Sequence, residues 1–185
     1  VEEAIAALRG EGPPDLMHVT YALGAEMLVL GGGAPTHDAA RRQMEVSIST
    51  GRAARKFQEI ISAQGGNPGV VDDPGALPQA NHCELYAAPR RGLVVRVEPR
   101  AVGKGVIAMG GGRTRIDDTV DPTVGFVITA KPGDWVESGE PLATIFARDR
   151  AGIEDGRGAL RQAILVSDEA DPPLPLVSHR VSSAG

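Results

Sequence analysis

The chain of 185 residues has little cysteine and few aromatic rings. Cys83 is its only cysteine, and Phe, Trp and Tyr together make up 3% of the sequence. One cysteine excludes an internal disulfide and a cysteine-rich zinc site, and it fits a reducing compartment, so we expect a cytoplasmic protein. A core with so few rings must rest on aliphatic side chains, and we expect Cys83 to be a small member of that core.

Long apolar runs and an excess of basic charge are also missing. No run approaches the ~20 apolar residues of a membrane-spanning helix, so we expect no membrane partner. The formal net charge is −5, with six basic and eight acidic residues in positions 1–65 and thirteen and sixteen in the remainder. Neither part is basic, so we expect no nucleic-acid partner.

Turn-forming residues are abundant, with 24 glycines and 14 prolines. Prolines are dense in residues 66–82, where they prevent a long helix. We therefore expect a helical segment over 1–65, a connector over 66–82, a second domain over 83–180 and a tail over 181–185. The helix expected at 1–9 has no capping residue ahead of it, which indicates that the chain is a piece of a longer protein.

Four helices are expected in the first 65 residues. Gly10 ends the first helix, and Thr36 caps the third, which runs to about Thr50. The second helix carries an apolar stripe with spacings of three and four residues, typical of a helix that packs on a partner. The stripe consists of Leu16, Val19, Leu23, Met27 and Leu30. If that partner lies outside the chain, the stripe is partly exposed and segment 1–65 is the less stable part.

Residues 83–180 alternate between strand and helix patterns. Apolar residues at every second position predict a strand over 124–130, and the Leu176–Val181 segment is interpreted as an edge strand. Strands are expected over 82–87, 92–97, 124–130, 142–147 and 176–181, and helices over 99–109 and 153–168.

Two local patterns have both a chemical and a structural interpretation. Gly110–Gly112 beside Arg113 could hold a phosphate, but neither a Walker motif nor a dinucleotide fingerprint is present, and we favour a helix stop. The acidic pairs Asp72–Asp73 and Asp117–Asp118 could bind a cation, and we favour solvated turns.

The four histidines do not pair at the helical spacing of a metal site. His82 and Cys83 are neighbours in a predicted strand, so their side chains point to opposite faces and do not form a dyad. No nucleophile, base and orienting residue come together in the sequence, so we assign no catalytic and no substrate-binding residue. The histidines are His18, His37, His82 and His179.

Residues 131–142 resemble the Gly-Asp-x-Val-x-x-Gly-x-x-Leu hairpin of biotinyl- and lipoyl-carrier domains. Trp135 lies between its two turns, and we expect the ring to pack on the domain without a ligand role. A carrier exposes a modified lysine on a second hairpin, and none of the lysines has the required flanks. They are Lys56, Lys104 and Lys131. A barrel-sandwich binding or carrier-like module is therefore the alternative hypothesis, which a lysine adduct in a mass measurement would identify.

Strings spread over nearly the whole chain, to about His179–Arg180, resemble the pyrimidine-nucleoside and thymidine phosphorylase family. They occur in the family's order, and their combination is more specific than any single string. The strings are Val1–Ile5 with Leu8–Pro13, Ser62–Gly66 with Val70–Pro74 and Leu77–Pro78, and Gly103–Arg113 with Ile116–Asp121 and Val124–Gly125.

The resemblance implies an α+β fold, in which a helical segment from the end of an α/β domain precedes a C-terminal α/β-hammerhead-like unit related to barrel-sandwich folds. It implies a homodimeric parent enzyme, a pentosyltransferase of nucleoside salvage. That enzyme converts thymidine or uridine and inorganic phosphate into free pyrimidine and (deoxy)ribose 1-phosphate. The family's phosphate- and base-binding residues precede Val1, so we expect the chain alone to be inactive.

One site residue is implied by the resemblance. Bacterial members of the family bind a monovalent cation, potassium, near their phosphate loop, and Glu3 matches the glutamate that completes the site. An acidic residue in a first helical turn also stabilises the helix macrodipole, so both interpretations of Glu3 remain open. No other cofactor is expected. A third hypothesis, an enzyme that is complete as it stands, is the least favoured.

Overall fold

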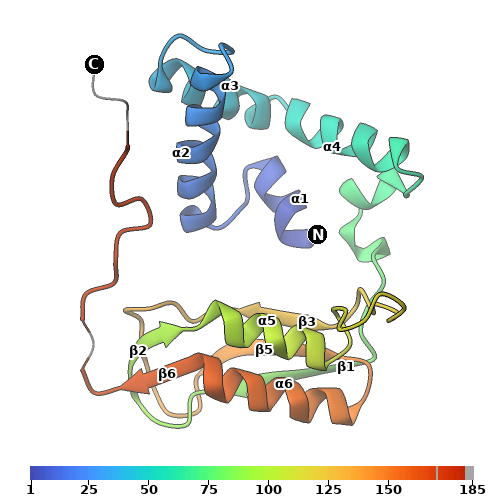
Figure 1. The fold of residues 1–185 in the computed structure, drawn as a ribbon, viewed down its shortest axis with the longest axis vertical. Helices are drawn as coiled ribbons and strands as arrows, with labels where there is room; N and C mark the ends of the chain where they lie inside the picture. The colour runs from blue at the N-terminus through green and yellow to red at the C-terminus, as the bar shows by residue number, and fades with distance from the viewer. Residues whose placement is uncertain (170, 182–185) are drawn as a thin grey trace. The chain divides into compact units, whose positions relative to one another are not determined.

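The computed structural model describes residues 1–169 and 171–181. The chain divides into two compact units. Unit 1 consists of Val1–Leu77 together with the chain from Leu174 onward, and unit 2 consists of Pro78–Pro173 (Figure 1). The chain therefore passes between the units twice, and unit 2 is an insertion in the sequence of unit 1.

Unit 1 is helical. Four α-helices come first along the chain. Two short 3-10 helices, η1 and η2, follow them and lie in the Pro- and Gly-rich segment before Leu77. The helices are α1 (Glu2–Arg9), α2 (Pro14–Leu30), α3 (His37–Ser49), α4 (Arg52–Ala63), η1 (Pro68–Val71) and η2 (Pro74–Ala76).

Local sequence signals account for most of the helix ends in unit 1. Gly10 ends α1 in the left-handed conformation, with φ of 87°, which costs glycine little. Pro14 occupies the first position of α2, where a missing N–H is no loss. The Thr36 hydroxyl accepts a hydrogen bond from the backbone N–H of Ala39 at 3.2 Å and so caps α3. No side chain caps α1.

The core of unit 1 is small. Its fully buried apolar residues are few and mostly alanines, namely Ile5, Ala25, Ala34, Ala40 and Val71. The side of α2 that carries Ala25 and Leu28 packs towards α3. The apolar stripe lies elsewhere on the helix, with exposed fractions of 61% for Leu23 and 82% for Leu30. The expectation of a partly exposed stripe is therefore confirmed within the described chain.

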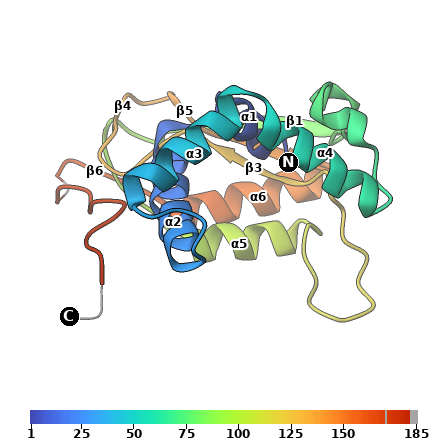
Figure 2. The ribbon, with the colours of Figure 1, turned by 90° about the horizontal axis from the view of Figure 1, so that it is seen from above.

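Unit 2 is an α+β structure with two three-stranded antiparallel sheets. One sheet has the order β1-β5-β3 and the other β4-β2-β6. Helices α5 and α6 lie side by side (Figure 2), and α6 packs on β1 and β5. The strands are β1 (His82–Ala87), β2 (Gly92–Val97), β3 (Gly125–Ile128), β4 (Trp135–Val136), β5 (Pro141–Ala147) and β6 (Ile164–Ser167), and the helices are α5 (Pro99–Ala108) and α6 (Arg150–Ala163).

The core of unit 2 is larger and more aliphatic than that of unit 1. The central strand β5 contributes Leu142 and Ile145, both fully buried, because it is paired on both sides and covered by α6. Val94 from β2 and Leu160 from α6 have no exposed surface either. The expected aliphatic core is therefore found here, and it can close without any residue of unit 1.

Three expectations about unit 2 and the tail were wrong. The helix expected over 153–168 ends at Ala163, because residues 164–167 pair with β2 as strand β6. Cys83 is exposed and not part of the core, because it points to the face of β1 opposite to that of Glu84, whose side chain meets Arg157 of α6. No strand is found in the described part of 171–181, so the edge strand expected at Leu176–Val181 is absent.

The Trp135 ring is less buried than expected. Trp135 lies in β4 after the turn at Gly133, whose φ is 96°, and 54% of the residue is exposed. Its indole N–H donates to Glu137 Oε1 at 3.0 Å, which holds the ring along the surface. Among the described residues, no helix has the length and apolar content needed to cross a membrane.

Candidate functional site

The predicted cation residue Glu3 lies exposed in the first turn of α1, next to Glu2. Both carboxylates are near the N-terminal end of the helix, where the macrodipole favours negative charge. Within residues 1–169 and 171–181, no three His, Cys, Asp or Glu side chains form a group that could hold a metal ion. Glu3 therefore has no set of partner ligands in the described part of the chain.

The glycine run after α5 is a helix stop. Gly110 has φ of 93°, and the N–H groups of Gly110 and Gly111 donate to the carbonyls of Ile107 and Val106 at 3.0 and 2.8 Å. Two of the three glycine amides thus point back into the helix end and not towards an anion. A side chain on Gly111 would meet Val124 Cγ2 at 2.9 Å, so close packing also requires glycine there.

The acidic residues after this run organise the loop that leads to β3. Asp118 Oδ2 accepts hydrogen bonds from the Thr114 hydroxyl at 2.7 Å and from the backbone N–H groups of Thr114 and Arg115 at 2.9 and 2.8 Å. The Thr114 hydroxyl and these amides hold the pKa of the Asp118 carboxyl below its usual value. Asp121 binds Thr123 in the same way, and its pKa is also lowered.

The acidic pair of the connector has a similar structural role. Asp72 Oδ2 accepts a hydrogen bond from the side-chain amide of Gln58 at 2.8 Å. Asp73 Oδ1 accepts from the backbone N–H of Gly75 at 3.1 Å and caps η2. The turn interpretation therefore agrees with the structure, although Asp72 and Asp73 bind protein groups and are not merely solvated.

His82 and Cys83 lie at the rim of a groove of about 560 Å³ between β1 and the start of α6. The groove is lined by His82, Cys83, Glu84, Arg150, Ile153 and Glu154. Glu84 forms an ion pair with Arg157, and this pairing raises the pKa of Arg157. The Glu84 carboxylate is thereby engaged by a cation, and among the described residues no hydrogen bond joins the Cys83 thiol to Glu84 or to His82.

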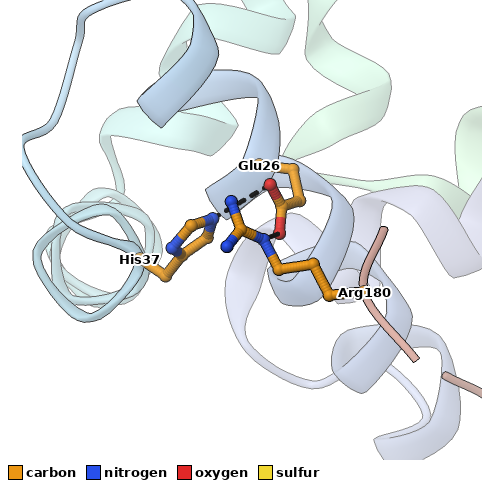
Figure 3. Close-up of polar contacts among 3 residues, drawn as sticks. All are labelled: Glu26, His37 and Arg180. Carbon is orange, nitrogen blue, oxygen red and sulfur yellow. Dashed lines mark hydrogen bonds and ion pairs between the residues drawn. The ribbon is translucent and has the colours of Figure 1, made fainter. Parts of the chain in front are cut away.

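One cluster of charged residues in unit 1 was not predicted from the sequence. Glu26 of α2 lies between His37, the first residue of α3, and Arg180 of the C-terminal segment (Figure 3). Arg180 Nε donates to Glu26 Oε1 at 2.6 Å, and His37 Nε2 lies 2.9 Å from Glu26 Oε2. The hydrogen bond from Arg180, and then that from His37, hold the pKa of the Glu26 carboxyl below its usual value.

No local signal in the sequence indicates this cluster. Glu26 and Arg180 are 154 positions apart, and each is an ordinary surface charge in its own segment. The cluster holds no nucleophile, and its geometry can bind a cationic side chain but has no evident means of catalysis.

Comparison with known proteins gives the class of unit 2. Residues 93–167, which run from β2 to the end of β6, match the family described as the pyrimidine nucleoside phosphorylase C-terminal domain. Unit 2 therefore contains a domain of this class.

The similarity to curated proteins extends beyond that domain into unit 1. The chain is 37% identical over 173 residues to the pyrimidine-nucleoside phosphorylase of Bacillus subtilis, covering 94% of this chain and 40% of that protein. It is 39% identical over 172 residues to a thymidine phosphorylase of Burkholderia orbicola, covering 92% and 39%. It is 37% identical over 182 residues to the pyrimidine-nucleoside phosphorylase of Geobacillus stearothermophilus, covering 98% of this chain and 42% of that protein.

Residues 93–167 belong to the family of the pyrimidine nucleoside phosphorylase C-terminal domain, and the similarity to pyrimidine-nucleoside and thymidine phosphorylases covers most of the chain, as its sequence strings indicated. The chain spans about two fifths of the length of the curated relatives it matches.

Proposed function

We propose that the chain is the C-terminal part of a pyrimidine-nucleoside phosphorylase. In the parent enzyme, a phosphate oxygen would bond to the anomeric carbon of thymidine or uridine while the bond from that carbon to the pyrimidine nitrogen breaks. The products are the free base and (deoxy)ribose 1-phosphate. The observation that carries this proposal is the match of residues 93–167 to the family's C-terminal domain.

The role proposed for this chain is structural. None of the clusters described above combines a nucleophile, a base and an anion-binding group, which a phosphorolytic site would need in some form. The phosphate and nucleoside would bind to the parts of the relatives that lie outside the similarity. We therefore expect the chain alone to release no thymine from thymidine.

The finer features implied by the family are part of the same proposal. They are a homodimeric, cytoplasmic parent enzyme of nucleoside salvage and a hammerhead-like arrangement of unit 2. The two antiparallel sheets, and the turn at Gly139 by which the chain passes from β4 in one sheet to β5 in the other, support that arrangement. A monovalent cation bound with the help of Glu3 is also proposed. Its support is the exposed carboxylate at the start of α1, where ligands from another segment can reach it.

A chimera tests the proposed function. The C-terminal two fifths of the Bacillus subtilis enzyme would be replaced by this chain, and phosphate-dependent release of thymine would be measured. We expect the chimera to be active and the purified 185-residue chain to be inactive. Thymine release by the chain alone, or a folded chimera with no phosphorolysis, would contradict the proposal.

The cation site is tested in the same chimera. Glu3→Gln should weaken the response of activity to added potassium, whereas Glu2→Gln, its neighbour in the same helical turn, should not. An equal response of both variants would remove Glu3 from the cation site and leave it as a helix-end charge.

A further inference from the structure

The C-terminal segment after Pro173 belongs to unit 1 although it follows unit 2 in the sequence. Its described part, residues 174–181, forms neither helix nor strand. It is therefore held by side-chain contacts and not by a backbone ladder. The contact that stands out is the one between Arg180 and Glu26 (Figure 3).

Glu26 is well placed to receive a cation from an extended segment. Its side chain is 32% exposed, and its two oxygens have separate partners, with Arg180 on Oε1 and His37 on Oε2. His37 is in turn fixed by its position at the start of α3, directly after the Thr36 cap. The carboxylate is thus oriented before the arginine arrives, which lowers the entropy lost when the ion pair forms.

A single surface ion pair contributes little to stability, so the segment must also lose little conformational entropy when it becomes ordered. Pro172, Pro173 and Pro175 restrict the backbone at the point where the chain returns to unit 1. Because the segment is covalently attached, its arginine is also present at a high effective concentration near Glu26.

We propose that the α2–α3 corner of unit 1, centred on Glu26 and His37, is a docking site for an extended arginine-bearing segment, and that its occupant is Leu174–Val181 of the same chain. The chain enters unit 2 at Pro78 and leaves it at Pro173. Docking of the segment after Pro173 gives the second of these ends an anchor in unit 1, as the first already has. The segment then acts as a strap that restricts the motion of unit 2.

The test is the backbone order of the segment in the full chain, measured by nitrogen-15 relaxation at residues 177–181. In the native chain we expect order parameters close to those of the helices, about 0.85. Glu26→Arg and Arg180→Glu should each lower them below about 0.6, the range of flexible chain. The double variant, which restores opposite charges, should recover the order, and the isosteric Glu26→Gln should lose it in part.

Matched charge reversals elsewhere serve as controls. Glu59→Arg changes an exposed helix carboxylate of unit 1, and Arg148→Glu changes an exposed arginine of unit 2. Neither should alter the order of residues 177–181. The proposal is overturned if the native segment is already flexible, if the double variant does not recover, or if the order depends on protein concentration, which would assign the occupant to a second copy.

Discussion

Gly105 of α5 lies so close to Ala159 of α6 that a Cβ atom built on it would stand 2.5 Å from the Ala159 Cβ. The same position faces the Phe126 ring at 3.2 Å. The contact between the two helices of unit 2 therefore depends on the missing side chain. Gly103, two residues earlier in the same helix, has nothing within 4 Å of a built Cβ.

These two glycines give the first prediction. Alanine is favoured over glycine inside a helix by about 1 kcal/mol, so Gly103→Ala should stabilise unit 2 by roughly that amount. Gly105→Ala gains the same propensity but forces α5 away from α6, and overpacking of this kind costs about 1–3 kcal/mol. Denaturant unfolding would show the opposite signs, and equal effects of the two substitutions would contradict the close helix contact.

The second prediction concerns the loop from Thr114 to Asp118. Asp118 has a lowered pKa in the folded chain, so its contribution to stability is complete above the unfolded value of 3.8. The contribution is lost as pH falls through the lower folded value. In an acid titration followed by NMR, the amides of Thr114 and Arg115 should lose their ordered shifts in that range. Asp118→Asn should weaken the loop at neutral pH, whereas Asp117→Asn should leave these amides unchanged.

The third prediction separates the two units by stability. Unit 1 buries few large side chains and exposes the α2 stripe, whereas unit 2 encloses a continuous aliphatic core. Amide exchange should therefore be fast in α2 and α4 and slow in β2 and β5. Proteases should cut first near the Pro- and Gly-rich end of unit 1, between Asn67 and Pro78. Equal protection in both units would show that the small core of unit 1 suffices.

The fourth prediction uses the only tryptophan. Trp135 is more than half exposed, so its fluorescence should be quenched efficiently by acrylamide. Trp135→Phe should change the free energy of unfolding by less than about 1 kcal/mol, as expected for a surface substitution. A blue-shifted, quencher-resistant emission would mean that the ring is covered in solution, and that its exposed placement is wrong.

Local chemistry made a large part of this fold predictable. Gly10 and the Thr36 cap fixed helix ends because the signals lie within one turn of the boundary. The end of α6 was missed because residues 164–168 continue an apolar helical pattern. Their strand state depends on pairing with β2, which lies some seventy positions earlier.

Exposure and long-range charge pairing were not predictable in the same way. Cys83 has the same strand neighbours whether its face is covered or open, and the outcome depends on which face of β1 the distant helix α6 covers. Glu26 and Arg180 carry no mutual signal in a single sequence, because 154 positions separate them. Glu3 is the one residue that the resemblance assigns to the family's cation site, so the sequence pattern could identify a candidate ligand but no complete site.

The insertion of unit 2 within unit 1 has a mechanical consequence. A force applied to Val1 and to Val181 would act first on two points of unit 1, because α1 and the docked segment both belong to it. The Arg180–Glu26 contact would carry that load before any of it reached the sheets of unit 2. In a pulling experiment, the strap should detach at low force as a separate early event, and only then should tension pass through Pro173 into the inserted unit.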